Sequence, residues 1–302
     1  MKQARWALAA ACLAWLAAVQ AQDIEPRSYS NAPVGVNFAI AGLADARGAL
    51  EFDPATQLTN AKLTTTSAVF AYARTLDLWG MSGKFDAILP YAAVSGSAQF
   101  AGQPVERSVD GLVDPRFRLS ANFYGAPALG LREFRDYRQD LIVGASLQVS
   151  VPLGQYDPSR LVNIGNNRWS FKPELGVSRA LGAWTLEGKL AATLFTDNKD
   201  FFGGHRRAQD PVYSVQGNAI YSFPGGVWVS LDATYLTGGR TTIDGDRGED
   251  LQQNWRVGGT IAFPVDARNS VKLSASSGVS ARTGNNFDLV GIAWQYRWGG
   301  GL

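Results

Sequence analysis

The sequence has little of what disulfide-rich, zinc-binding or helical membrane proteins depend on. Its 302 residues contain one cysteine and one histidine, which excludes an internal disulfide framework and the usual zinc ligand sets. Charged residues make up only 18% of the chain. After residue 21, no apolar run approaches the roughly 20 residues that a membrane-spanning helix needs. These absences leave β-structure as the main way to build the fold.

The first 21 residues have the pattern of a secretory signal peptide. Lys2 and Arg5 precede the uncharged run WALAAACLAWLAAV at 6–19, and small residues follow where cleavage is expected. A short N-terminal anchor is the alternative. Cleavage after Ala21 would remove Cys12 and leave 26 basic and 26 acidic residues, so the mature net charge would be zero. A neutral chain offers no basic surface for nucleic acid.

Glycine and aromatic residues are abundant and are spread over segments that alternate in polarity. The chain has 33 glycines, 9 tryptophans, 10 tyrosines and 15 phenylalanines. Alternating segments of about ten residues are typical of strands that cross a bilayer at a tilt. We assign such segments to 34–42, 63–75, 83–91, 116–124, 140–151, 169–178, 184–190, 213–221, 227–235, 254–263, 271–280 and 287–302.

The connections between these segments alternate between long and short. Long stretches lie at 43–62, 92–114, 152–168, 197–211 and 238–250, and short turns lie at 76–82, 180–183, 223–226 and 264–269. The connections 125–139 and 282–286 break this rule. Such asymmetry with an even strand number is typical of outer-membrane barrels. We therefore predict an all-β transmembrane antiparallel up-and-down β-barrel of about 12 strands over 34–302, preceded by an N-terminal periplasmic segment at 22–33.

The apolar faces of the strands are expected to point outward, toward lipid. Val36, Phe38 and Ile40 share one face of the first segment, and Trp294, Tyr296 and Trp298 share one face of the last. A soluble β-sandwich or lipocalin-like barrel has the same period with the apolar face inward, so periodicity does not separate the two. Segment length and aromatic residues at strand ends favour the membrane barrel.

The polar faces are expected to line a lumen in which opposite charges pair. The charged residues of this lining are Lys84, Asp86, Arg116, Arg118, Asp140, Lys172, Glu174, Glu187, Lys189, Asp232, Arg256, Lys272 and Arg297. Aromatic residues at strand ends are expected to form girdles at the membrane interfaces. These residues are Trp169, Trp184, Tyr221, Tyr235, Trp255, Trp294, Tyr296 and Trp298.

This lining is net positive, which favours anions and polar or aromatic acids. Twelve strands enclose less room than the roughly 16–18 strands of water-filled porins. We therefore expect a narrow or partly plugged path. The plug would come from residues 22–33 or from a long loop that folds inward.

The sequence offers little for catalysis or metal binding. His205 lies between two predicted strands beside two arginines, without the serine partner geometry that a lipase needs. The loop DGDRGED at 244–250 is rich in carboxylates, but its spacing does not match an EF-hand. We interpret both as solvated loop features, and we expect no catalytic residue, no metal and no cofactor.

Several runs resemble the outer-membrane family labelled "meta-pathway of phenol degradation". They are GLVDPRFRLSANFYGAPAL (111–129), QDLIVGASLQVSVPLGQYDPSRLVNIGNNRWSFKPELGVSRALG (139–182), TDNKDFFGG (196–204), TGGRTTIDG (237–245) and AWQYRWGGGL (293–302). The resemblance covers about 34–302. It implies an exported, transporter-like barrel in a bacterial outer membrane, linked to the breakdown of phenolic compounds.

Three hypotheses follow for the function. The first is a channel for passive uptake of small molecules, among them aromatic or phenolic compounds. The second is a non-conducting barrel that serves as a structural or surface-interaction scaffold, and the third is an outer-membrane enzyme of lipase type, which we do not favour. The expected partners are outer-membrane lipid, small-molecule solutes and the outer-membrane assembly machinery, with no nucleic acid.

Overall fold

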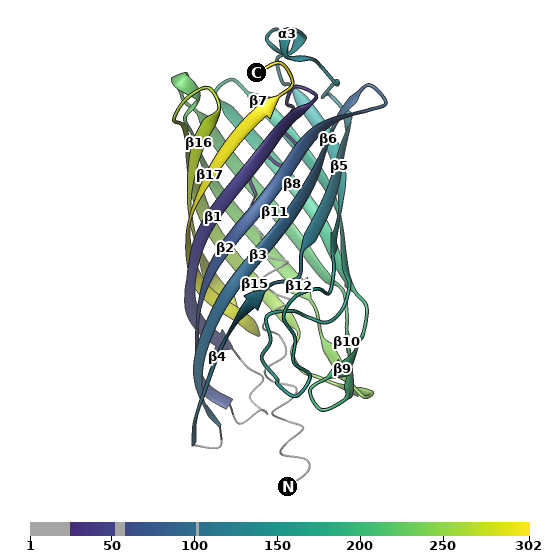
Figure 1. The fold of residues 1–302 in the computed structure, drawn as a ribbon, viewed down its shortest axis with the longest axis vertical. Helices are drawn as coiled ribbons and strands as arrows, with labels where there is room; N and C mark the ends of the chain where they lie inside the picture. The colour runs from purple at the N-terminus through teal and green to yellow at the C-terminus, as the bar shows by residue number, and fades with distance from the viewer. Residues whose placement is uncertain (1–24, 52–57, 101–102) are drawn as a thin grey trace.

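The computed structural model describes residues 25–51, 58–100 and 103–302, so the predicted signal peptide and Cys12 lie outside the described residues. The described chain forms a closed antiparallel barrel of twelve strands, which confirms the predicted fold class (Figure 1). The barrel strands are β1 (Val36–Glu51), β2 (Leu58–Leu78), β3 (Met81–Phe100), β5 (Arg116–Tyr124), β6 (Leu141–Ser150), β7 (Ser170–Leu181), β8 (Trp184–Phe195), β11 (Val212–Ser222), β12 (Trp228–Gly238), β15 (Gln252–Pro264), β16 (Asn269–Ala281) and β17 (Gly284–Gly299).

The first and last strands close the barrel. β1 pairs with β17 in antiparallel register from Val36↔Gly299 to Glu51↔Gly284. The other barrel strands pair with their neighbours in chain order. Closure satisfies the backbone hydrogen bonds of the strands, which an open edge in lipid would not.

One end of the barrel carries the short turns, together with the start of β1 and the end of β17. Trp79 and Gly80 form the turn between β2 and β3 with φ of 57° and 82°, the two positive values of a type I′ hairpin. The predicted long connection 125–139 holds the short helix α3 (Leu131–Phe134). Figure 1 shows α3 beside the C-terminus at this end. By its short turns this is the periplasmic end.

The opposite, extracellular end has structure of its own. β4 (Gln103–Leu112) folds back on β3, while β9 (Asn198–Phe201), β10 (His205–Gln209), β13 (Thr241–Ile243) and β14 (Asp246–Arg247) form a second sheet. The interpretation of 92–114 as a loop is wrong, because β3 continues to Phe100 and pairs with β4. This hairpin stands beyond the predicted membrane segment and alternates weakly in polarity, so hydrophobic periodicity did not reveal it.

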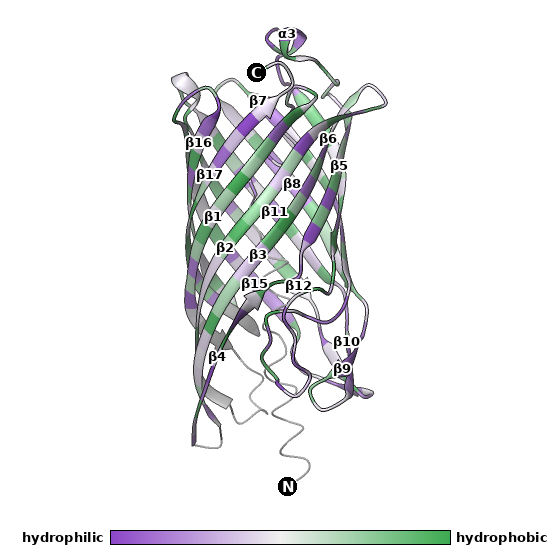
Figure 2. Cartoon of the chain, viewed as in Figure 1, coloured by the Kyte–Doolittle hydropathy of each residue, from purple (hydrophilic) through white to green (hydrophobic). Residues whose placement is uncertain are grey.

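The outer face of the barrel is apolar. Large hydrophobic side chains are exposed there, among them Leu231 at 75%, Leu43 at 60% and Ile292 at 50%. Figure 2 shows hydrophobic bands along β1, β2 and β3. Exposure of so many large apolar residues is normal only against lipid or a partner. No helix among the described residues is long and apolar enough to span a membrane.

The first strand departs from the predicted orientation. Phe38 and Ile40 of β1 lie directly opposite Arg297 and Gln295 of β17, and all four side chains line a cavity in the lumen. The prediction that the apolar face of 34–42 meets lipid is therefore wrong for these residues. The neighbouring face, with the exposed Leu43, points outward instead. Both faces of β1 are apolar, so alternation identified the strand but not its direction.

Candidate functional site in the barrel lumen

Most of the charged residues that we assigned to the lumen lie inside the barrel. Six are buried, namely Asp86, Arg118, Glu187, Lys189, Asp232 and Arg256. Four are half-buried, namely Lys84, Arg116, Lys172 and Glu174. Lys272 and Arg297 are exposed and line the lumen cavity. Opposite charges meet along the walls, as in the 3.0 Å contact of Arg118 Nε with Asp86 and the 3.9 Å contact of Lys172 with Glu174.

Asp140 lies elsewhere. It precedes the first residue of β6, its side chain is 75% exposed, and it pairs with Arg179 at 3.2 Å at the periplasmic rim. The alternating pattern of 140–151 placed it on the polar face, but the strand begins one residue later. Asp140 therefore belongs to the rim and not to the lining.

Residues 25–33, which precede β1, contact the inner wall of the barrel, and this segment is one of the two sources from which we expected a plug. Glu25 forms an ion pair with Arg118, which also binds Asp86. The backbone oxygen of Glu25 accepts a hydrogen bond of 2.7 Å from Lys189 Nζ, which also donates to Ser28 at 3.1 Å. Two buried lumen cations thus find their partners in this segment. We call residues 25–33 the plug.

Arg27 fixes the plug to the neighbouring part of the wall. Its backbone N–H donates to Glu187 at 2.8 Å, and its guanidinium donates to Ser222 at 2.6 Å. The guanidinium carbon lies 4.9 Å from the ring centre of Trp228. These contacts reach β8, β11 and β12, so the plug is attached to several strands and not to a single one.

Tyr29 occupies a seat formed by two glycines. Gly144 and Gly176 are cross-strand partners on β6 and β7. A Cβ at Gly176 would lie 2.0 Å from the Tyr29 ring, and one at Gly144 would lie 2.6 Å from it. The Tyr29 hydroxyl donates to Glu174 at 3.0 Å. The ring therefore needs glycine at both positions, a fit that no sequence pattern indicated.

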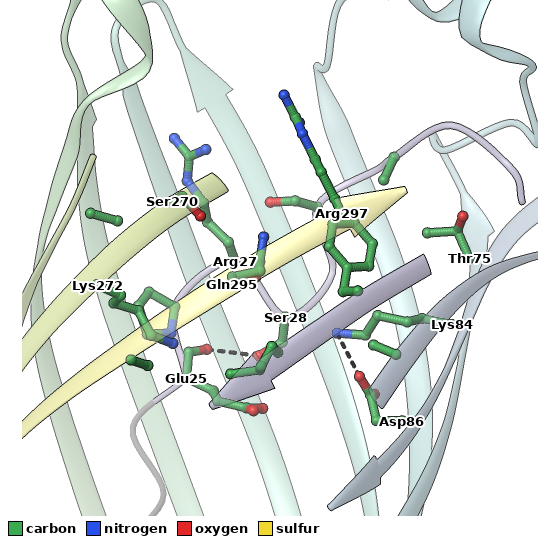
Figure 3. Close-up of a pocket in the computed structure, with 18 of the residues that line it drawn as sticks. Glu25, Arg27, Ser28, Thr75, Lys84, Asp86, Ser270, Lys272, Gln295 and Arg297 are labelled. Atoms are coloured by element: carbon green, nitrogen blue, oxygen red, sulfur yellow. Dashed lines mark hydrogen bonds and ion pairs between the residues drawn. The ribbon is translucent and has the colours of Figure 1, made fainter. Parts of the chain in front are cut away.

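The plug leaves one side of the lumen open. A cavity of about 520 Å³ lies beside the plug and is lined by residues of β1, β2, β3, β5, β12, β15, β16 and β17. Figure 3 shows Lys272, Gln295, Arg297 and Lys84 around this space, with Arg27 and Ser28 of the plug beside them.

A loop narrows the extracellular end of the same lumen. In the connection 151–169, Ile164 is 1% exposed and packs against Ala92 and Val94 of β3. The buried carboxylate of Asp114 accepts hydrogen bonds of 2.8 Å and 2.9 Å from the backbone N–H groups of Asn166 and Gly154. These contacts hold the loop against the inner face of the barrel, at the other end of the lumen from the plug.

The aromatic residues predicted for the girdles gather near the ends of the strands. Trp184 and Tyr221 contact edge-on near the periplasmic end, with ring centres 5.0 Å apart. Tyr235 and Trp255 lie 4.9 Å apart toward the extracellular end, where Trp169 precedes β7. On β17, Trp294, Tyr296 and Trp298 form a continuous stack with ring centres 6.2 Å and 5.7 Å apart. Two levels of aromatic residues fit two membrane interfaces.

His205 is bound to a carboxylate in the extracellular sheet. Its Nδ1 lies 2.6 Å from Asp244 Oδ2, and Asp244 also accepts the backbone N–H of Arg206 at 2.8 Å. These two hydrogen bonds, the backbone one first, lower the pKa of the Asp244 carboxyl below its usual value. The pair joins β10 to the end of β13, and we assign it a structural role.

The carboxylates of the loop 244–250 do not converge. Asp250 is occupied by the backbone N–H and the hydroxyl of Thr241, at 2.9 Å and 2.7 Å. Glu249 faces Arg240 at 3.8 Å. Within the described ranges, no group of three or more histidine, cysteine, aspartate or glutamate side chains is placed to hold a metal ion.

Comparisons with known proteins agree with this architecture. The family model described as "Putative MetA-pathway of phenol degradation" matches residues 49–296. The COG4313 outer membrane channel from Pseudomonas putida F1 is similar in structure, with a TM-score of 0.75, 19% identity, and coverage of 91% of this chain and 100% of that one. The transport unit of the autotransporter AIDA-I from Escherichia coli has a TM-score of 0.52, 10% identity, and coverage of 92% and 93%. No curated protein matches the sequence. At these identities the structural likeness shows the outer-membrane barrel fold alone.

Proposed function

We propose that this chain, which belongs to the family described as "Putative MetA-pathway of phenol degradation", is an outer-membrane channel for the passive entry of small molecules. The observation that carries the proposal is the cavity of about 520 Å³ beside the plug. A barrel with a purely structural role has no need of a lumen cavity of this size, because protein interiors otherwise pack closely. We assign no catalytic step to the chain.

The plug sets the size of what can pass. It binds the charged wall through Arg118, Lys189 and Glu187, and a cavity lies between it and Phe38 and Ile40 of the opposite wall. A solute then moves along β1, β2 and β17 past the plug. This geometry favours compounds of about one aromatic ring, because pockets of a few hundred Å³ suit small ligands. Phenolic compounds of the kind named in the family's description have this size.

Planar bilayers test the channel directly. The purified full-length chain, checked as a folded barrel by its altered migration in detergent gels before boiling, should give small and fluctuating conductance steps. A folded barrel that stays silent in bilayers, both intact and without the plug, would contradict the channel.

A second candidate function is a non-conducting scaffold. The observation that favours it is the extracellular sheet of β9, β10, β13 and β14 with its buried residues Phe201 and Ile243, since an ordered sheet can serve as a binding surface. Deleting residues 238–250 separates the two functions. A scaffold would lose its partner binding in this variant and would conduct neither before nor after the deletion, whereas a channel would conduct in both forms.

A further inference from the structure

The wall of the cavity opposite the plug has an apolar surface at the periplasmic end of the lumen. Phe38 and Ile40 of β1, Ala73 of β2 and Ala293 of β17 line it. The register places Phe38 directly opposite Ala73, so these side chains form one continuous patch. Cross-strand neighbours on one face lie about 5 Å apart at Cβ, which is close enough for a planar ring to cover several of them.

Cations border this apolar patch. Six basic and three acidic residues line the cavity. The acids Glu25 and Asp86 are occupied by Arg118, and Asp86 also pairs with Lys84 at 3.5 Å. The third acid, Asp266, accepts hydrogen bonds from its own turn, including 2.8 Å from the Asn269 backbone N–H. The acids of the cavity are thus already engaged.

Among the described residues, four of the six cations form no salt bridge, and two of these four lie beside the apolar patch. Among the residues that the structure describes, neither Lys272 nor Arg297 forms a salt bridge. Arg297 donates through Nε to the backbone oxygen of Ala267 at 2.9 Å, and among the described residues its two terminal nitrogens have no side-chain hydrogen-bond partner. Asp232 is near enough to attract Lys272 electrostatically, but it forms no ion pair with it. Both cationic side chains are solvent-accessible.

The strand register brings these cations to the apolar patch. Arg297 lies directly opposite Phe38, and Lys272 lies directly opposite Ala293. Between them, Gln295 lies opposite Ile40 and adds a hydrogen-bonding amide. A ligand that is anionic at one end and apolar at the other can therefore satisfy both kinds of surface at once. A neutral solute would leave the cations unpaired, and a small anion would leave the patch uncovered.

We propose that this cavity is a selectivity site for aromatic monocarboxylates. Arg297 and Lys272 hold the carboxylate by charge-assisted hydrogen bonds, and Phe38 and Ile40 carry the ring. The cavity of about 520 Å³ accommodates a single-ring acid with water. The proposal rests on the proposed channel function and specifies its substrate class.

Benzoate is the probe, with acetate as the small-anion reference. Reversal potentials are measured in bilayers that contain the full chain, with chloride on one side and benzoate or acetate on the other. Although benzoate is the larger ion, its permeability should exceed that of acetate. Benzoate binding by the detergent-solubilised chain is measured separately by isothermal titration calorimetry.

Variants test whether Lys272, Arg297 and Phe38 cause the benzoate preference. The double variant K272Q/R297Q should lower benzoate permeability by about tenfold, which corresponds to about 1.4 kcal/mol of lost carboxylate binding. Phe38→Ala should lower benzoate permeability and leave acetate unchanged. The matched control K199Q/R132Q removes one lysine and one arginine outside the lumen, at exposed positions, and should behave as wild type.

The outcomes separate the site from the channel. Conductance with equal benzoate and acetate permeabilities, or a benzoate preference that survives K272Q/R297Q, would overturn the site and leave the channel standing. Saturable benzoate binding that K272Q/R297Q abolishes, in a chain that does not conduct, would overturn the channel and keep the site. Neither binding nor conductance would overturn both.

Discussion

The two halves of the barrel interior differ although both belong to one sheet. The wall from β5 to β12 carries buried charges and binds the plug through Arg118, Glu187 and Lys189. The wall from β17 to β2 presents Phe38 and Ile40 and leaves a cavity. The outer faces of both halves are apolar, because both meet the same lipid. Only the inner faces are free to differ.

This difference shows how a small barrel can be plugged without being sealed. A plug attached equally to all strands would fill a twelve-stranded lumen. Here the ion pair of the plug and its hydrogen bonds to Lys189 and Glu187 lie on the wall from β5 to β12, and buried charges need such partners because desolvation is costly. The plug also accepts a hydrogen bond of 2.5 Å from Thr75 of β2 at the Pro33 backbone oxygen. The wall from β17 to β2 presents the apolar Phe38 and Ile40 beside the cation Arg297, and the described plug residues form no ion pair with it. This asymmetry leaves a cavity of about 520 Å³ beside the plug.

Deleting the plug should have the largest effect, because it removes the main difference between the two walls. Without residues 25–33, both walls would face an open lumen, and the single-channel conductance should rise several-fold. Bilayer recordings of the deletion variant check this. The control replaces the same residues by a glycine–serine segment of equal length, which should give a similar rise because it lacks Arg27 and Tyr29. Unchanged conductance in both variants would show that the plug does not limit the path.

Removing Arg118 should loosen the plug without deleting it. Arg118→Met leaves Glu25 and Asp86 without their shared cation. The Arg118 side chain is 10% exposed and that of Glu25 is 38% exposed. The cost should therefore lie between about 1 kcal/mol for a surface pair and about 3–5 kcal/mol for a buried pair. Longer open times in bilayers are the expected readout. The control Arg179→Met breaks the exposed rim pair with Asp140 and should change little.

The sequence predicted the barrel well because lipid imposes a simple rule. Every strand had to place apolar residues on the lipid side, and that demand produced the alternating segments behind the confirmed twelve-stranded fold. Closure of β17 on β1 followed from the need to pair every edge. Beyond the membrane the rule no longer applies, and the hairpin of β3 and β4 was missed there.

The lumen was less predictable because its partners are distant in the chain. The polar faces placed Arg118, Lys189 and Glu187 inside, but no local pattern linked them to the plug more than 90 residues away. The seat of Tyr29 on Gly144 and Gly176 depends on strand register, which a single sequence does not fix. Phe38 was oriented wrongly for a related reason, since β1 is apolar on both faces.

Adding a methyl group to the Tyr29 seat tests a single contact between the plug and the wall that binds it. In Gly176→Ala, the new Cβ would lie 2.0 Å from the Tyr29 ring, so the ring must leave its seat. The plug would remain attached through Arg118 and Arg27, and conductance should rise less than after deletion. Gly188→Ala is the matched control, because a Cβ there meets nothing within 4 Å. Equal behaviour of the two variants would contradict the fit.

The smallest effect is expected at the extracellular sheet, which lies beyond both walls. The pKa of Asp244 is lowered by the Arg206 backbone N–H and by His205. A carboxyl with a depressed folded pKa stabilises the sheet above its unfolded pKa, and this stabilisation is lost as pH falls through the folded value. Amide exchange in β10 and β13 should therefore accelerate slightly below about pH 4, the ordinary range of an aspartate. Asp244→Asn should show the faster exchange at neutral pH as well, whereas Asp246→Asn, at an exposed position in β14, should not. Because Asp244 lies at the surface, neither change should alter conductance, which separates the stability of the loops from the passage along the apolar wall.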